Sequence, residues 1–379
     1  MRSYKLGELV TFNYGKSLPK RDRVDGVYPV MSSAGITGYH NEYLIEGPGV
    51  IVGRKGSIGT VYFEEGNFFP IDTCFYLTVN DESKLDLKYL YYMLTQSNLK
   101  NLNSDAAVPG LNRDIAYAQY FEVPSLKEQI QIVLMLEKYD RLIENNNRRI
   151  AILEEMAQSL YREWFVNFRF PGHEAIEFKD SPLGQIPEGW EVKASNEVID
   201  INPRTSLPKK GIKPFVPMTS LSESSMIIGD IEEREGNSGT KFKNRDTLFA
   251  RITPCLQNGK IGYVQFLNEE NPIGFGSTEF IVLRESILPS EFIYCLARSP
   301  NFRSHAINSM AGADGRQRVK PDCFSAYFLA VPPKRLLERF TSIAKPCFDE
   351  IHNLNKKNKI LRSQRDMILP KLISGNISI

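Results

Sequence analysis

The chain repeats its own sequence, and this repeat constrains the fold more than any other feature. Val123-Pro124 closes one half of the chain, and Val331-Pro332 closes the other half 208 residues later. The same offset then continues without a gap through a helical region of about 40 residues, which indicates a duplication. Pairs of residues that keep this offset are Ile143 with Ile351, Asn147 with Asn355, Arg148-Arg149 with Lys356-Lys357, and Leu153 with Leu361.

Upstream of the helical region the repeat continues in patches. Residues 50–54 match residues 247–251 at an offset of 197, and residues 56–63 match residues 259–266 at an offset of 203. Residues 110–113 match residues 315–318 only loosely. Such stepwise offsets are expected where loops lengthen and the framework does not. The pattern predicts a globular domain over residues 1–124, a helix over 125–170, a second domain over 171–332 and a second helix over 333–379.

The two helical segments have the spacing of a coiled coil. Ser125 and Glu128 fit a capping box, which marks a helix start, and apolar residues recur every seven positions. At 1.5 Å per residue, about 40 residues span roughly 60 Å. We therefore expect the two helices to pair antiparallel, with the globular domains at opposite ends; the alternative is two unrelated surface helices. The spaced columns are Leu136, Ile143, Ile150, Ala157 and Trp164; Ile132, Tyr139, Asn146, Leu153 and Leu160; and Phe340, Cys347, Leu354, Leu361 and Ile368.

Polar and proline residues interrupt these columns. Residues 145–147 are three asparagines, and Asn353 and Asn355 lie at the matching place in the second helix. A buried asparagine can fix the register of a coiled coil, but we adopt the alternative that these amides face water. Pro346 is expected to kink or delay the second helix.

The globular parts are predicted to be mixed. Runs at residues 28–31, 49–53, 59–63 and 73–79 are typical of strands bounded by Gly or Pro, and residues 87–99 indicate a helix. In the second copy, residues 279–283 indicate a strand and residues 290–296 a helix. The predicted fold is α+β: two mixed α/β domains, separated by two long antiparallel coiled-coil helices and related by a pseudo-twofold repeat.

The sequence lacks the signatures of catalysis and of membrane insertion. No phosphate-binding G-x-x-x-x-G-K-[ST] loop and no [DN]-P-P-[FY] adenine pocket of amino-methyltransferases is present. The four histidines are too scattered for a metal site. The five cysteines are far apart, as in a cytoplasmic protein with reduced thiols, and no apolar run is long enough to span a membrane. We therefore expect that this chain is not an enzyme and holds no cofactor.

Three stretches together resemble the specificity subunits of type I restriction–modification systems. The first is residues 164–172 (WFVNFRFPG) followed by residues 182–190 (PLGQIPEGW). The second is the repeated strand and turn that carries Arg54 and Arg251, and the third is the Val-Pro boundary before each helix. The resemblance covers essentially the whole chain. One departure is that the first domain begins with residues 4–7 (YKLG) and lacks the PEGW that precedes the second domain.

The resemblance implies a division of labour among subunits. This subunit would recognise double-stranded DNA, with each target-recognition domain bound to one half of a split target and the helices acting as spacer and docking site. Two modification subunits would methylate adenine with S-adenosylmethionine, and restriction subunits would use ATP and Mg for translocation and cleavage. A protein-binding scaffold without DNA affinity is the main alternative, and an enzyme with an unusual active site is a third.

Charge gives a limited guide to the DNA-contacting residues. The net charge is only +2, whereas many DNA-binding domains are strongly basic. Phosphates are usually contacted by Lys and Arg, and base edges by Arg, Lys, Asn or Gln. For any single candidate the alternative is a solvated surface charge. For Arg54 and Arg251 the alternative is a framework salt bridge. The candidates, all in expected loops, are Lys16, Lys20, Arg21, Arg54, Lys55, Ser57 and Arg113 in the first domain, and Arg204, Lys209, Lys210, Arg251, Lys260, Arg316, Gln317 and Arg318 in the second.

Overall fold

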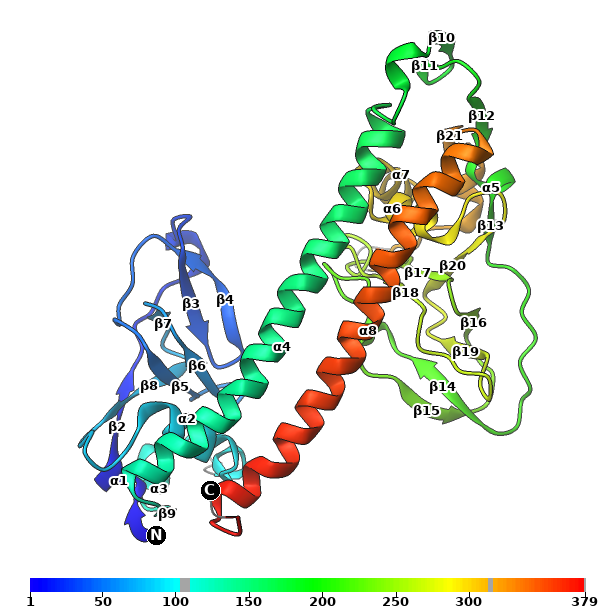
Figure 1. Ribbon diagram of the computed structural model, residues 1–379. Coiled ribbons are helices and arrows are strands. Elements are labelled where there is room, and N and C mark those ends of the chain that lie inside the picture. The colour runs from blue at the N-terminus through cyan, green and yellow to red at the C-terminus, as the bar shows by residue number, and fades with distance from the viewer. Residues whose placement is uncertain (103–109, 313–315, 378–379) are drawn as a thin grey trace. The chain divides into compact units, whose positions relative to one another are not determined.

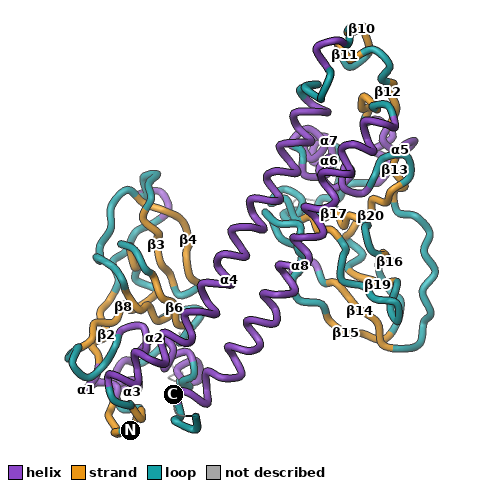
Figure 2. Tube along the Cα trace, in the orientation of Figure 1, coloured by secondary structure: helices purple, strands orange, loops and turns teal. Residues whose placement is uncertain are grey.

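The structure is a computed structural model that describes residues 1–102, 110–312 and 316–377 (Figure 1). Its contacts divide the chain into two compact units. Unit 1 comprises Met1–Ile143 with Lys359–Ile379, and unit 2 comprises Glu144–Asn358. The protein is mixed α/β, and two long helices, α4 (Leu126–Tyr161) and α8 (Lys334–Ile373), each contribute a segment to both units (Figure 2).

Unit 1 contains two small sheets and a short strand pair. The central sheet has the order β2-β8-β5-β6, and the second sheet has the order β4-β3-β7. In β5 every residue is buried, because Val50 and Val52 pack with helix α2 while Ile51 packs with Met31 of the second sheet. The elements are β1 (Arg2–Lys5), α1 (Leu6–Leu9), β2 (Val10–Tyr14), β3 (Tyr28–Ser32), β4 (Gly35–His40), β5 (Gly49–Gly53), β6 (Val61–Glu64), β7 (Phe69–Pro70), β8 (Cys74–Val79), α2 (Leu87–Thr95), α3 (Arg113–Tyr117) and β9 (Tyr120–Val123), with 3-10 turns η1 (Lys20–Asp22) and η2 (Leu99–Asn101).

Unit 2 has sheets of the orders β13-β20-β17-β18 and β15-β14-β19-β16. Its elements are β10 (Phe178–Ser181), β11 (Gly184–Pro187), β12 (Glu191–Ala194), α5 (Ser195–Val198), β13 (Ile199–Ile201), β14 (Ile212–Val216), β15 (Glu232–Glu235), β16 (Thr240–Lys243), β17 (Thr247–Ala250), β18 (Ile261–Tyr263), β19 (Ile273–Gly276), β20 (Phe280–Glu285), α6 (Ser290–Arg298), α7 (Pro300–Asn308) and β21 (Phe328–Val331), with a π-turn (Arg162–Val166) and 3-10 turns η4 (His173–Ala175), η5 (Met218–Ser220) and η6 (Pro321–Ala326).

The two units follow the same chain path. In each, a short strand pairs with the strand before the long helix (β1 with β9, β12 with β21) and leads through a four-residue helix into the central sheet. The backbone bonds also correspond, because Leu6 N donates to Gln119 O at 2.8 Å and Ser195 N donates to Tyr327 O at 2.8 Å. In the second sheet, strand β16 pairs with β19 over four residues, whereas the corresponding segment of unit 1 makes a single bridge, Ile45 with Phe68 beside β7.

The long helices bury one predicted column fully and the other two in part, with Tyr139, Leu153, Leu160, Cys347, Leu361 and Ile368 half-buried. Leu136, Ile143, Ile150, Ala157 and Trp164 are each less than a tenth exposed, and the Ser125–Glu128 capping box forms, with Ser125 N donating to Glu128 Oε2 at 2.9 Å. Helix α8 begins at Lys334 and continues through Pro346, so the expected delay at this proline is wrong.

Within each unit, polar contacts join the two helices. In unit 1, Arg365 Nη1 donates to Asp140 Oδ1 at 2.6 Å. In unit 2, Arg149 pairs with Glu350 at 2.8 Å, and the rings of Trp164 and Phe340 lie 6.3 Å apart. Asn146 pairs with Asn358, whereas Arg149, further along α4, pairs with Glu350, which is earlier in α8. The helix segments of unit 2 therefore run antiparallel.

One asparagine departs from the expected exposure to water. Asn145, Asn147 and Asn353 are exposed as expected, but Asn146 is buried and donates to Asn358 Oδ1 at 2.9 Å. Asn358, 1% exposed, was not among the predicted positions. The amides satisfy one another, which is the condition under which buried polar groups are tolerated.

The strands and helices of the globular parts agree with the sequence pattern, except at the C-terminal end of one helix. The run at residues 54–60 is a turn that connects the antiparallel strands β5 and β6. Helix α2 ends at Thr95, not near Leu99. The Thr95 hydroxyl donates to Tyr92 O at 2.6 Å and the Ser97 hydroxyl donates to Leu94 O at 2.6 Å, because short hydroxyl side chains compete with the helical backbone bonds.

Candidate nucleic-acid interface

Arg54 occupies a fixed position in unit 1. It directly follows β5, its N–H donates to Thr73 O at 2.9 Å, and its carbonyl accepts from Leu111 N at 2.9 Å. The turn packs tightly, because a Cβ on Gly53 would lie 2.0 Å from Ser57 O. The sequence therefore needs glycine before Arg54, and the arginine leaves the sheet at a defined place.

Arg251 has the corresponding position in unit 2. It directly follows β17, its N–H donates to Glu279 O at 3.0 Å, and its carbonyl accepts from Val319 N at 2.8 Å. Thr73 and Glu279 each immediately precede the strand next in the sheet, β8 or β20. The repeated arginine is thus held by the same two backbone bonds in both units.

In unit 1 the arginine meets an exposed aromatic ring. The guanidinium carbon of Arg54 lies 4.7 Å from the ring centre of Tyr14, and that of Arg113 lies 5.4 Å from the same ring. Arg54 also donates to the carbonyl oxygen of Asp72 at 3.1 Å. Among the described residues neither arginine forms an ion pair, so the framework salt bridge considered for Arg54 is absent from this part of the chain.

In unit 2 the arginine lines a cleft of about 380 Å³ with two other cationic residues, Arg204 and Lys241. The Nε of Arg251 is buried and has no hydrogen-bond partner among the described residues. Thr278 lines this cleft and also a neighbouring one of about 730 Å³, which includes Lys209.

Five other candidates of unit 1 are exposed and scattered. Arg21, with its side chain 85% exposed, pairs with Asp22 at 3.5 Å, and Lys55 is fixed through its backbone by a bridge to Gly110. Of the seven predicted residues, only Arg54 and Arg113 come together through contact with the same ring, that of Tyr14. The exposed residues are Lys16, Lys20, Arg21, Lys55 and Ser57.

Several candidates of unit 2 already have partners. Arg318 forms a salt bridge with Glu279 at 2.8 Å, and this hydrogen-bonded contact raises the pKa of Arg318. Lys260 Nζ donates to Met218 O at 3.4 Å. Lys209, Lys210 and Arg316 are exposed, and Gln317 is half-buried.

The loose match of residues 110–113 with 315–318 is wrong in register. Lys55 bridges to Gly110, whereas Ile252, the residue after Arg251, bridges to Arg318. Gly110 therefore corresponds to Arg318, again at an offset of 208, and Gly315 lies outside the described residues. As a result Arg113 corresponds to Pro321, so its contact with Tyr14 has no counterpart in unit 2.

Sequence reasoning missed residues that the fold brings to these sites. Tyr14 ends β2, and Lys241 lies in β16, where unit 1 has Leu44 at the offset of 197. Arg234 places its guanidinium carbon 3.8 Å from the ring centre of Phe215. An exposed tyrosine at a strand end gave a usable signal, because basic residues with interleaved aromatics favour nucleic-acid binding, but Lys241 gave none.

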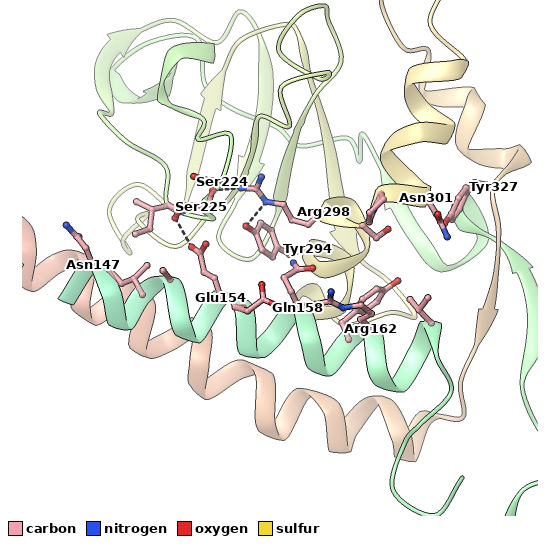
Figure 3. Close-up of a pocket in the computed structure, with 18 residues that line it drawn as sticks. Asn147, Glu154, Gln158, Arg162, Ser224, Ser225, Tyr294, Arg298, Asn301 and Tyr327 are labelled. Carbon is pink, nitrogen blue, oxygen red and sulfur yellow. Dashed lines mark hydrogen bonds and ion pairs between the residues drawn. The ribbon is translucent and has the colours of Figure 1, made fainter. Parts of the chain in front are cut away.

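The most spacious of the described pockets lies elsewhere in unit 2, between α4 and the α6–α7 region (Figure 3). It measures about 800 Å³, and its polar groups are largely engaged. Glu154 accepts from Ser225 Oγ at 2.7 Å and from Met226 N at 2.8 Å. Arg298 Nη1 donates to Gly259 O at 2.9 Å. The two bonds of Glu154 attach α4 to the globular part of unit 2.

Burial raises the pKa of Glu154, while the bonds from Ser225 and Met226 oppose that shift.

Among the described residues no group of three or more His, Cys, Asp or Glu is arranged to hold a metal ion. Nor does that part of the chain contain a helix with the length and apolar character needed to cross a bilayer.

The motif WFVNFRFPG and the later PEGW form one aromatic cluster in unit 2. Trp190 is 1% exposed. Its ring stacks on Phe170 at 5.6 Å and meets Phe168 edge-on at 5.2 Å, and Phe165 lies 6.1 Å away. The motif thus joins the end of α4 to the start of the globular part of unit 2.

Comparison with known proteins agrees with this architecture. Residues 1–155 match the type I restriction modification DNA specificity domain. The type I restriction enzyme MjaIX specificity subunit of Methanocaldococcus jannaschii is 27% identical over 310 residues, 77% of this chain and 69% of that protein. The EcoAI specificity subunit of Escherichia coli is 29% identical over 183 residues, 45% of this chain but only 31% of that protein.

A crystal structure of the type I restriction–modification S subunit from M. genitalium aligns with a TM-score of 0.59 at 17% identity, covering 98% of this chain and 95% of that one. The fold is therefore that of an S subunit, a mixed α/β protein with a long internal helix and a C-terminal helix. The predicted resemblance to the specificity subunits of type I restriction–modification systems is confirmed. The relatives' names designate specificity subunits, in agreement with the prediction of a non-catalytic chain.

Proposed function

We propose that this chain recognises a bipartite DNA sequence within a type I restriction–modification complex, with one half-site bound by each unit. The observation that carries this proposal is the repeated arginine. Arg54 and Arg251 leave equivalent strands with the same backbone bonds, and neither is neutralised by a carboxylate within the described residues. A single chain with two unlike sites suits an asymmetric target, whereas a symmetric dimer suits a palindrome.

The domain organisation belongs to the same proposal. We regard residues 1–124 and 171–332 as two copies of a target-recognition domain, supported by the matching sheet orders. Helices within 125–170 and 333–379 would set the distance between the half-sites and dock two modification subunits. These partners would bind S-adenosylmethionine, restriction subunits would bind ATP and Mg, and the complex would work on DNA in the cytoplasm. The site residues are the fifteen candidates named above, together with Tyr14 and Lys241.

Methylome sequencing of the host, with and without this chain, identifies the target. Binding of the chain with its modification partners is then measured on duplexes whose gap between half-sites is lengthened or shortened by one base pair. This change rotates one half-site by about 34–36° relative to the other, so we expect binding to collapse. Equal affinity across gap lengths would refute the spacer role. Affinity that does not depend on salt would favour a protein-binding scaffold, because phosphate contacts release counterions.

A further inference from the structure

The cleft beside Arg251 has a lining that the proposed function does not yet explain. Arg204, Lys241 and Arg251 line it, and its eleven lining residues include no Asp or Glu. In a chain with a net charge of only +2, three cations around one small cleft represent a local surplus of positive charge.

These three cations lack the partners that other basic residues of unit 2 have. Arg284 forms a buried pair with Asp246 at 2.6 Å, and Arg318 pairs with Glu279. Within the described ranges, Arg204, Lys241 and Arg251 form no ion pair. The Nε of Arg251 is also buried without an acceptor, and an unpaired buried donor costs free energy until a ligand or water satisfies it.

The framework holds the cleft in place. Asn202 directly follows β13, and its Oδ1 accepts from Val282 N at 2.8 Å, so the chain leading to Arg204 is anchored to β20. Lys241 lies in β16, which is paired with β19. At Gly239, φ is +120° and a Cβ would lie 2.0 Å from Gly276 O. Such close backbone contact requires glycine at this edge of the cleft.

The chemistry of the lining favours a ligand made only of acceptors. Arginine and lysine side chains only donate hydrogen bonds, and the Asn202 acceptor is already occupied by Val282 N. Phosphate oxygens only accept, and a guanidinium can donate two parallel bonds to such a group. The guanine edge in the major groove also presents only acceptors, but it is uncharged, so it offsets three positive charges less well than an anionic phosphate does.

We infer that the cleft binds a single phosphate group of the DNA backbone, contacted by Arg204, Lys241 and Arg251 together. This inference rests on the proposed function, because the phosphate is taken to come from DNA. Its role would be to fix the position of unit 2 on the duplex, since phosphate contacts orient a protein without selecting sequence.

The test uses the full chain and a duplex of random sequence, with binding measured by fluorescence anisotropy over a range of salt concentrations. Arg204→Gln and Lys241→Gln are each expected to weaken binding severalfold. The triple variant that adds Arg251→Gln should lower the slope of log K against log salt by about 0.9, the value for one phosphate. Arg335→Gln, which removes an exposed charge in α8, is the matched control and should leave the slope unchanged.

The outcomes separate the inference from the proposed function. A fall in slope of about 2.7 would mean that the three cations contact three separate phosphates, and an unchanged triple variant would show that the cleft does not bind DNA. Both results overturn the single-phosphate site and leave the proposed function standing. Wild-type protein without salt-dependent affinity overturns both.

Two further measurements complete the design. If the triple variant does not fold, the Arg204→Gln/Lys241→Gln pair, which keeps Arg251, must still lose affinity at an unchanged melting temperature. Inorganic phosphate is added at constant ionic strength as the second probe. If inorganic phosphate stabilises the wild-type chain as much as the duplex does, the cleft is a site for a free anion. This result would overturn the assignment of the cleft to DNA.

Discussion

The two units place the same arginine in different chemical surroundings. In unit 1, Arg54 lies over the exposed ring of Tyr14 beside Arg113. In unit 2, Arg251 lines a cleft with Lys241 from β16, and the residue at the corresponding place in unit 1 is Leu44. Sheet order and backbone bonds are shared, whereas the side chains around the arginine are not. The comparison teaches that one framework can present two unlike surfaces, as the proposed recognition of two unlike half-sites would require.

The largest expected difference between the units concerns their attachment to the long helices. Phe340, fully buried, packs on Phe165 with ring centres 5.1 Å apart, and its counterpart at the offset of 208 is Ile132, 5% exposed. Phe340→Ala should cost about 3–5 kcal/mol and Ile132→Ala about 2–4 kcal/mol, because both leave cavities.

Fluorescence separates these two effects. The chain has two tryptophans, Trp164 and Trp190, and both belong to unit 2. Denaturant unfolding followed by tryptophan emission should shift strongly in Phe340→Ala. Ile132→Ala should shift the circular-dichroism transition more than the emission transition. Identical shifts of both signals in both variants would show that the units unfold as one.

The second prediction concerns the arginine pair. Arg54→Ala should weaken binding at one half-site by about 1–3 kcal/mol, the usual cost of a lost base contact. Half-site variants of the target, with one half correct and the other scrambled, measure this loss by anisotropy. Arg54→Lys keeps the charge but not the two-pronged geometry, so it should lose discrimination while keeping affinity for random DNA. Equal loss on specific and random DNA would make Arg54 a phosphate contact, like that inferred for Arg251.

The third prediction uses the buried asparagines. At the offset of 208, Asn146 corresponds to Leu354 and Asn358 to Ile150, both of which are buried. Asn358→Ile alone should cost about 1–3 kcal/mol, because it leaves the Asn146 amide buried without its partner. The double variant Asn146→Leu/Asn358→Ile should recover most of this loss. Thermal melting of both variants checks this, and a double variant no more stable than the single one would contradict it.

The smallest effect should come from Glu154. Because burial raises the pKa of Glu154 in the folded chain, the folded state binds a proton at Glu154 more tightly than the unfolded state does. The contribution of this proton to the stability of the fold is lost as pH rises through the raised pKa. Glu154→Gln keeps an acceptor for Ser225 and removes the buried charge, so its melting temperature should change less between pH 5 and pH 8 than that of the wild type. A Glu154→Gln variant with the same pH dependence as the wild type would show that Glu154 does not titrate in this range.

Much of the framework could be predicted from sequence because it is encoded locally. Residues 49–53 cluster apolar residues between glycines, residues 73–79 cluster aromatic and β-branched residues, and they form β5 and β8 nearly as expected. The column from Leu136 to Trp164 is buried as its seven-residue spacing predicts. Prediction failed where a partner distant in sequence decides the outcome, as for the burial of Asn146, which depends on Asn358.

The candidate site could be predicted only at its repeated position. Arg54 and Arg251 were found because they recur, not because of their surroundings. Tyr14 approaches Arg54 through strand pairing across the sheet, and Lys241 approaches Arg251 through the pairing of strand β16. Arg318 was predicted as a DNA contact, but Glu279 pairs with it in the fold. Long-range pairing of this kind leaves no periodic trace in the sequence.

The division of the chain has a consequence for its synthesis. Unit 2 is one continuous segment, Glu144–Asn358, whereas unit 1 needs both Met1–Ile143 and Lys359–Ile379. Leu369 and Leu372 are buried in the core of unit 1. A chain emerging from the ribosome at about 5–20 residues per second therefore completes the later unit first. The earlier unit must wait some 10–40 seconds, with the surface that will receive Leu369 and Leu372 uncovered, until the last helix turns arrive.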